Sequence, residues 1–172
     1  AGALPLDGRS RFLKRLYNAI GGSRGMRDAA AWIAVSPIEL AQYAAYGVAP
    51  DRVVVIPNGV DAGAFIGGDG ERFRARFGLP GGPIVLFVGR LAWSKGPDLL
   101  LDAFANLNDR LPAHQLVLVG TDEGMLTRLR DTARARGVAG RVHFPGYVGG
   151  ADKADAYDAA ALLVLPSRYE AM

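Results

Sequence analysis

The stretch that decides the fold is "IVLFVGRLAWSKGPDLLLDAF", at residues 84–104. It opens with an apolar run of β-branched and aromatic residues, which predicts a buried strand over residues 84–88. Apolar residues at helical spacing follow, at Leu99, Leu100, Ala103, Phe104 and Leu107. The turn between the two contains Gly89, Arg90 and Lys95. A strand that leads through a glycine turn into a helix is typical of an α/β fold.

The same alternation continues toward the end of the chain. Short apolar runs bounded by Gly or Pro at residues 115–120, 141–144 and 161–166 predict three further strands. Helical patterns lie between them, at Leu126, Leu129 and Ala133, and at Ala154, Tyr157 and Ala161. This order predicts a Rossmann-like, doubly wound parallel sheet, whose ligands bind beyond the carboxyl ends of the strands.

The first sixty residues are predicted to form the last elements of a second Rossmann-like domain. Residues 31–35 and 51–57 have strand patterns, and residues 37–46 have a helical pattern. The Gly-rich segment after them is typical of a connection. The expected boundaries are residues 1–61 for the end of the first domain, 62–82 for an interdomain linker and 83–172 for the second domain.

Composition excludes several classes of protein. Half of the 172 residues are hydrophobic and 22% are charged, so the chain can bury a core. It has no cysteine and two histidines, His114 and His143, which excludes disulfides and thiolate metal sites. We expect a soluble, cytoplasmic protein, because we find neither a membrane-length apolar run nor the pattern of a signal peptide. The net charge of +3 suits a small anionic ligand as well as a polymer. No nucleic-acid partner is expected.

The turn after residues 84–88 has the chemistry of a phosphate site. Gly89 permits close approach of a ligand, Arg90 can bind phosphate oxygens bidentately, and Lys95 adds a mobile charge. The helix that follows presents free N–H groups, which attract anions. Neither a Walker A loop nor a G-x-G-x-x-G fingerprint fits the order of residues, which disfavours dehydrogenases and epimerases. On the loop alone, two solvated cations remain an alternative.

Several motifs together resemble one family. "GRLAWSKG" is similar to a G-R-x-x-x-x-K-G loop, "VIPNGVD" to the segment that joins two domains, and "LLVLPSRYEAM" to the start of an acidic donor-site motif. "LVLVGTDEGMLTRLRDTARARGVAGRVHFPGYV" continues the match between them. The chain therefore resembles retaining glycosyltransferases of the GT-B fold, of the group 1 type, which use nucleotide-sugar donors. The alternatives are a non-catalytic nucleotide-binding module or another nucleotide-sugar enzyme such as an epimerase.

The resemblance implies a set of site residues. Arg90, Lys95 and Glu170 would be catalytic: the two cations would stabilise the leaving diphosphate without a metal, and Glu170 would bind the donor sugar. The implied donor-binding residues are Gly89, Arg90, Lys95, Gly120, His143, Phe144, Gly146 and Glu170. For His143 and Glu170 the alternatives are a strand-edge histidine without a ligand and an exposed loop carboxylate. The pair Asp122 and Glu123 is expected to cap a helix rather than to form a catalytic dyad.

The resemblance also implies what this chain would leave out. The second glutamate of the donor motif would follow Met172, and the acceptor pocket would precede Ala1. The chain is thus expected to be a fragment that transfers no sugar alone. No cofactor is expected besides the donor. The acceptor is an unknown glycan or lipid-linked acceptor, and the resemblance implies polysaccharide, lipid-linked glycan or glycolipid synthesis. A basic helix with Arg9, Arg11, Lys14, Arg15, Arg24 and Arg27 could contact the cytoplasmic face of a membrane, but a solvated helix face is the favoured interpretation. The base, the sugar, the linkage and the oligomeric state are not determined by the sequence.

Overall fold

The computed structural model describes Leu16, Gly25 and residues 28–168. The chain forms two compact units, which divide between Val60 and Asp61. Each unit has its own parallel sheet. The predicted basic helix lies outside the described residues, and so does Glu170. Among the helices that the structure describes, none combines the length and the apolar character needed to cross a membrane.

The first unit is built on a sheet of two parallel strands, β1 (Trp32–Ala34) and β2 (Val53–Val55). Helix α3 (Glu39–Ala45) and the 3-10 helix η2 (Pro50–Arg52) connect them. The Tyr43 hydroxyl donates a hydrogen bond of 2.9 Å to the carbonyl of Ile33, which fixes α3 on the sheet. The expected strand, helix and strand are therefore present, each shorter at its ends than the sequence pattern predicted.

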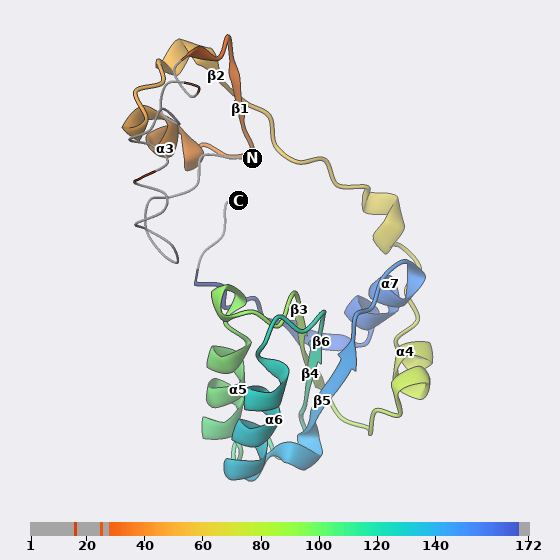
Figure 1. The fold of residues 1–172 in the computed structure, drawn as a ribbon. Coiled ribbons are helices and arrows are strands. Elements are labelled where there is room, and N and C mark those ends of the chain that lie inside the picture. The colour runs from red at the N-terminus through yellow and green to blue at the C-terminus, as the bar shows by residue number, and fades with distance from the viewer. Residues whose placement is uncertain (1–15, 17–24, 26–27, 169–172) are drawn as a thin grey trace. The chain divides into compact units, whose positions relative to one another are not determined.

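The second unit contains a four-stranded parallel sheet in the order β5-β4-β3-β6 (Figure 1). Its strands are β3 (Ile84–Val88), β4 (Gln115–Val119), β5 (Val142–Gly146) and β6 (Ala160–Leu163). Its helices are α4 (Gly70–Phe77), α5 (Pro97–Asn106), α6 (Leu126–Ala135) and α7 (Ala151–Asp158), with 3-10 helices η3 (Ala62–Phe65), η4 (Trp93–Lys95) and η5 (Ala139–Arg141). This is the predicted doubly wound α/β arrangement.

Alternation along the strands divides the core between the two faces of the sheet. Val85 and Phe87 of β3 pack in one cluster with Leu101 and Phe104 of α5 and Leu129 of α6. The residues between them in β3 point to the opposite face, in a cluster with residues of α4 and α7: Ile84, Leu86, Phe73 and Ala156. Helices therefore cover both faces, α5 and α6 on one and α4 and α7 on the other (Figure 1). Because β3 and β4 are buried on both faces, their sequences are continuously apolar apart from Gln115, the first residue of β4.

Helix α4 lies in the segment predicted as a connection, so no helix was expected there. Asp69 accepts a hydrogen bond of 3.0 Å from the N–H of Arg72 at its start, and Gly78 ends it in the left-handed conformation. Asp155 of α7, which is buried, pairs with the Arg72 guanidinium at 2.6 Å. The hydrogen bonds from Arg72 hold the pKa of Asp155 below its ordinary value. These contacts join α4 to the second unit.

Strands β3 and β6 mark the point where the order of the sheet reverses. The chain leaves β3 through α5 and builds β4 and β5 on one side, then returns to place β6 on the other side of β3. In open α/β sheets, ligands bind at such a point, outside the carboxyl ends of the strands. A ligand site is therefore expected among the segments that follow β3, β4, β5 and β6.

Candidate functional site

Three glycines bring the backbone segments at the carboxyl edge of the sheet close together. The N–H of Gly89 donates to the carbonyl of Val119 at 2.9 Å, and the N–H of Gly120 donates to the carbonyl of Gly146 at 2.8 Å. A Cβ atom at Gly120 would lie 1.7 Å from the carbonyl oxygen of Gly89, and the φ angle of Gly120 is +151°. Only glycine fits there without displacing the backbone.

A cavity of about 210 Å³ opens at this edge. It is lined by Val88, Gly89, Arg90, Val119, Gly120, Thr121, Tyr147, Val148 and Lys153. The lining holds two cationic side chains and, among its described residues, no carboxylate. Ligand pockets usually measure ~300–1,000 Å³, so the cavity has room for part of a ligand such as a diphosphate group. Its charge favours an anion.

Arg90 follows β3 and Gly89, and among the residues that the structure describes its side chain pairs with that of Glu123. Its Nη1 lies 2.8 Å and 2.9 Å from the two carboxylate oxygens of Glu123. Both side chains are substantially exposed, at 58% and 42%. Exposed ion pairs of this kind contribute little stability, about 0–1 kcal/mol, so an anionic ligand can replace Glu123 at small cost.

Lys95 ends the 3-10 helix η4 on the same loop and lies outside the lining of the cavity. Gly96 follows with a φ angle of +67°, and Pro97 begins α5. The cations and the start of α5 thus lie on the single loop that connects β3 to α5, as the sequence analysis expected. The helix begins only after the extra turn of η4, so its N-terminus is not directly next to Gly89.

Lys153 of α7 is a cavity residue that the sequence analysis missed. Its Nζ lies 5.4 Å from the centre of the Phe65 ring and 5.8 Å from that of Tyr157. Lys153 belongs to no motif, and only the packing of α7 beside the end of β4 brings it to the cavity. Thr121 and Tyr147 were also missed, although each directly follows a glycine that was assigned to the site.

The segment after β6 contacts the loop after β3 through Arg168, which the sequence analysis did not single out. Its guanidinium forms two hydrogen bonds with Asp98 of α5, at 2.8 Å and 2.9 Å. The hydrogen bonds from Arg168 lower the pKa of Asp98. The sequence signal was available, because Arg168 directly follows the "PS" turn at the carboxyl end of β6.

The predicted residues divide into two groups in the structure. Gly89, Arg90 and Gly120 line the cavity, and Gly146 is hydrogen-bonded to Gly120. His143 lies toward the amino end of the sheet, where its Nε2 is 2.9 Å from the Oε1 of Gln115, the first residue of β4. The structure therefore does not bring His143 to the cavity. Burial lowers the pKa of His143.

Phe144 faces the cluster shared with α5 and α6, and the guanidinium of Arg130 lies 5.7 Å from the centre of its ring. It does not line the cavity. Asp122 has the predicted capping role: one carboxylate oxygen accepts from the N–H groups of Gly124, Met125 and Leu126 at 2.9–3.0 Å. These bonds, led by that from Leu126, hold the pKa of Asp122 low. Glu123 instead pairs with Arg90.

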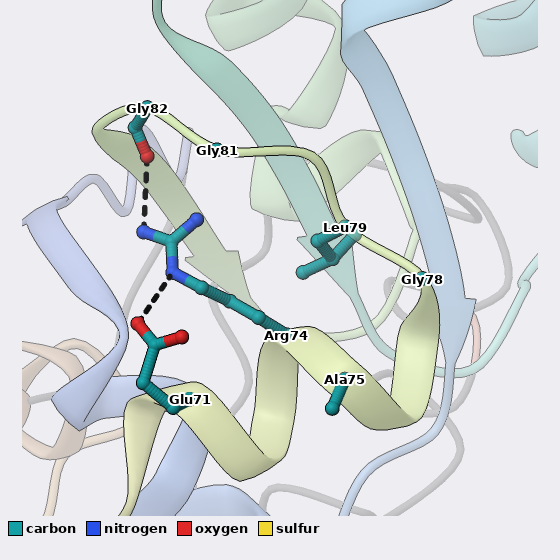
Figure 2. A pocket seen from close by; sticks show the side chains of 7 residues that line it. All are labelled: Glu71, Arg74, Ala75, Gly78, Leu79, Gly81 and Gly82. Atoms are coloured by element: carbon teal, nitrogen blue, oxygen red, sulfur yellow. Dashed lines mark hydrogen bonds and ion pairs between the residues drawn. The ribbon is translucent and has the colours of Figure 1, made fainter.

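A second hollow, of about 660 Å³, lies beside α4 and is open to solvent (Figure 2). Arg74 crosses it and donates a hydrogen bond of 3.0 Å to the carbonyl of Gly82, while Glu71 approaches the same guanidinium at 3.8 Å. Gly82 lies just before β3, so this hollow is at the amino end of the sheet. The Arg74 guanidinium is also bonded to the carbonyl of Pro80. Because the guanidinium of Arg74 donates to backbone carbonyls, this hollow is not a candidate site.

Two family models match the chain. The model described as "Glycosyl transferases group 1" matches residues 69–172, and the one described as "Glycosyltransferase Family 4" matches residues 3–63. The first of these ranges includes the entire carboxyl edge described above.

Curated relatives and solved structures agree with these models. The chain is 39% identical over 149 residues to mannosylfructose-phosphate synthase of Agrobacterium fabrum, covering 80% of this chain and 33% of that protein. It is 40% identical over 134 residues to D-inositol 3-phosphate glycosyltransferase of Acidothermus cellulolyticus, covering 73% of this chain and 30% of that protein. The chain thus spans about a third of the length of these relatives.

Among solved structures, Anabaena HepE in complex with UDP-glucose matches with a TM-score of 0.75 at 25% identity, over 92% of this chain and 43% of that one. WaaG, a glycosyltransferase involved in lipopolysaccharide biosynthesis, matches with a TM-score of 0.76 at 25% identity, over 95% and 45%. Both matches extend over most of this chain and less than half of the other.

Proposed function

Because the chain belongs to the glycosyl transferases of group 1, with the GT-B fold, we propose that it is part of an enzyme that transfers a sugar from a nucleoside diphosphate sugar to an acceptor, with retention of anomeric configuration. The observation that carries the proposal is the cationic cavity at the carboxyl edge of the four-stranded sheet. Relatives with UDP or UDP-glucose bound support the choice of donor class. The acceptor is a glycan or a lipid-linked glycan.

The reaction breaks the bond between the anomeric carbon and the oxygen of the β-phosphate. The electron pair of that bond goes to the phosphate oxygen, the acceptor hydroxyl forms the new bond to the anomeric carbon, and its proton passes to an oxygen of the leaving diphosphate. Negative charge therefore grows on the leaving diphosphate. A cation next to that oxygen stabilises the transition state more than the ground state.

Arg90 has the place and the geometry for this role. It follows β3 at the mouth of the cavity, its charge is permanent, and its present partner Glu123 is exposed and exchangeable. Lys95 lies on the same loop and provides the second positive charge. With these two residues the enzyme neutralises the leaving group by side chains, without a metal ion. Gly89 and Gly120 allow the phosphates to approach the backbone.

Glu170 completes the proposed set by binding the hydroxyl groups of the donor sugar. In the sequence it follows the "PS" turn after β6, as the first glutamate of the donor motif does, and it lies outside the residues that the structure describes. The chain alone is proposed to bind a nucleoside diphosphate weakly and to transfer no sugar, because an acceptor held against the anomeric carbon accounts for ~7–11 kcal/mol of such a barrier.

The test is a panel of nucleotide sugars and acceptors given to the natural protein that carries this chain, with product anomers identified by NMR. Transfer with retention from one donor is the expected result, and Glu170→Gln is expected to lower turnover while leaving the affinity for the free nucleoside diphosphate nearly unchanged. Inversion at the anomeric carbon, or no transfer from any nucleotide sugar, contradicts the proposal.

A further inference from the structure

Lys153 is the cavity residue whose positive charge does not come from the loop after β3. We propose that it binds a phosphate group of the donor, so that cations from two separate elements, Arg90 after β3 and Lys153 on α7, hold one diphosphate. The inference rests on the proposed function and adds to it a binding residue that lies in none of the sequence motifs described above.

Helix α7 is acidic, but its carboxylates are bound by α4. The helix contains three aspartates and Lys153. Each aspartate is hydrogen-bonded to a residue of α4, at 2.5–2.9 Å, in the pairs Asp152–Arg76, Asp155–Arg72 and Asp158–Gly70. Lys153 forms no ion pair with a carboxylate among the described residues. The helix therefore uses its negative charges to bind α4 and presents its positive charge at the cavity.

Two aromatic rings hold the ammonium group of Lys153 without neutralising it. Its Nζ lies 5.4 Å from the centre of the Phe65 ring and 5.8 Å from that of Tyr157, and the centres of the two rings lie 5.7 Å apart. Lys153 is half-buried, and cation–π contacts at partly exposed positions are weak. A phosphate oxygen that enters the cavity can therefore accept a hydrogen bond from Lys153 without first displacing a carboxylate.

The remaining lining of the cavity also suits an anion. Besides Arg90 and Lys153, the described lining consists of glycine, valine, Thr121 and Tyr147, and the two hydroxyl groups can donate hydrogen bonds to phosphate oxygens. Two like charges that share a cavity repel each other, and a bound anion removes this cost. The diphosphate of a nucleotide sugar carries one negative charge on each phosphate, which matches the two cations of the cavity.

Two substitutions separate the charge of Lys153 from its packing. Lys153→Met keeps an unbranched apolar side chain against Phe65 and Tyr157 but removes the charge. Lys153→Arg keeps the charge and can still donate to phosphate oxygens. A residue that only packs against the two rings should tolerate methionine, whereas a residue that binds phosphate should tolerate arginine better.

The experiment is a calorimetric titration of the natural protein that carries this chain with UDP, GDP and ADP, with the corresponding nucleosides and with inorganic pyrophosphate. Lys153→Met is expected to weaken the binding of the preferred diphosphate and of pyrophosphate by about tenfold, because one charge-assisted hydrogen bond is lost. The nucleoside should bind nearly as well as it binds to the wild type. Lys153→Arg should retain most of the affinity for the diphosphate.

Arg134→Met is the matched control, because it removes the same charge from the last turn of α6, where the side chain is 67% exposed, pairs with Asp131 and does not line the cavity. This variant is expected to bind every ligand within about twofold of the wild type. An equal loss in both methionine variants, equal losses for diphosphate and nucleoside, or unchanged diphosphate affinity in Lys153→Met would overturn the role of Lys153 and leave the proposed function in place. Failure of the wild-type protein to bind any of the diphosphates overturns the proposed function itself and this role with it.

Discussion

The two ends of the four-stranded sheet use arginine in opposite ways. At the amino end, the guanidinium of Arg141 donates to the carbonyls of Leu111 and His114 at 2.6 Å and 3.2 Å and also bonds to Asn108. At the carboxyl end, Arg90 lines a cavity and pairs only with the exposed Glu123 among the contacts described above. An arginine whose donors are occupied by backbone carbonyls stabilises the fold, whereas one with an exchangeable partner beside a cavity is available to a ligand.

Glycines at the two ends of the sheet also differ, and replacing one at the carboxyl end is expected to have the largest effect on stability. Gly120→Ala should destabilise the second unit by about 4 kcal/mol or more, because its new Cβ atom would overlap the carbonyl of Gly89. Gly140→Ala, at the amino end in η5, meets no atom within 4 Å and should change the free energy of unfolding by less than about 0.5 kcal/mol. Urea unfolding of both variants measures the contrast. Equal stability would show that the carboxyl edge is not tightly packed.

Arg141 should be a stability residue and nothing more. Removing its charged hydrogen bonds with Arg141→Ala is expected to cost about 2 kcal/mol of unfolding free energy, since three carbonyls and an amide lose their donor. The affinity for a nucleoside diphosphate, measured by calorimetry on the folded variant, should stay at the wild-type value. A large loss of affinity would show that Arg141 also contributes to ligand binding, so that the arginines at the two ends of the sheet do not differ in role.

Replacing Glu123 is expected to have a smaller effect, which is a gain in ligand affinity. Because the carboxylate competes with a phosphate for Arg90, Glu123→Gln should raise the affinity for a nucleoside diphosphate, by no more than about fivefold given the value of exposed pairs. Titration of both proteins at low salt checks the direction. Weaker binding by the variant would mean that Glu123 orients Arg90 for the ligand rather than competing with it.

The ion pair between Arg168 and Asp98 depends on pH, and this is the smallest of the expected effects. The hydrogen bonds from Arg168 lower the pKa of Asp98 in the folded protein. The ion pair therefore stabilises the fold fully above the ordinary aspartate pKa of about 3.9. Its contribution to stability is lost as the pH falls through the lowered pKa of Asp98. The difference in melting temperature between wild type and Asp98→Asn should shrink as the pH is reduced below about 4. A difference that grows on acidification would contradict this sign.

Much of the sheet was predictable, because buried parallel strands are continuously apolar and β3 and β4 are buried on both faces. Helix α4 was not predicted, since its exposed side is rich in arginine and only Phe73 among its large side chains is fully buried. Its caps, Asp69 and Gly78, were the usable signal. The Gly-rich composition on either side of α4 outweighed that signal in the sequence analysis.

The site was predictable only where it follows the chain order. Gly89, Arg90 and Gly120 follow strands, so the rule that ligands bind beyond carboxyl ends predicts them at the edge where the cavity lies, and their role in binding stays a prediction. Lys153 reaches the cavity through contacts with residues far away in sequence, which no local pattern encodes. Arg168 had a local signal in the "PS" turn before it, but its pairing with Asp98 depends on the fold. His143 is the converse case: it is near Gly146 in sequence, but three residues of strand span about 10 Å, enough to place it toward the other end of the sheet and away from the cavity.

The most direct test of the account is a calorimetric titration of the chain and its Arg90→Ala variant with UDP, GDP and ADP and with the corresponding nucleosides. Charge-assisted hydrogen bonds contribute about 1.5–3 kcal/mol each, so the variant should bind the preferred diphosphate at least about tenfold more weakly and the nucleoside nearly as well as wild type. Lys95→Ala should behave in the same way. Equal losses for the diphosphate and the nucleoside, or unchanged diphosphate affinity, would contradict the assignment of the carboxyl edge as the phosphate site.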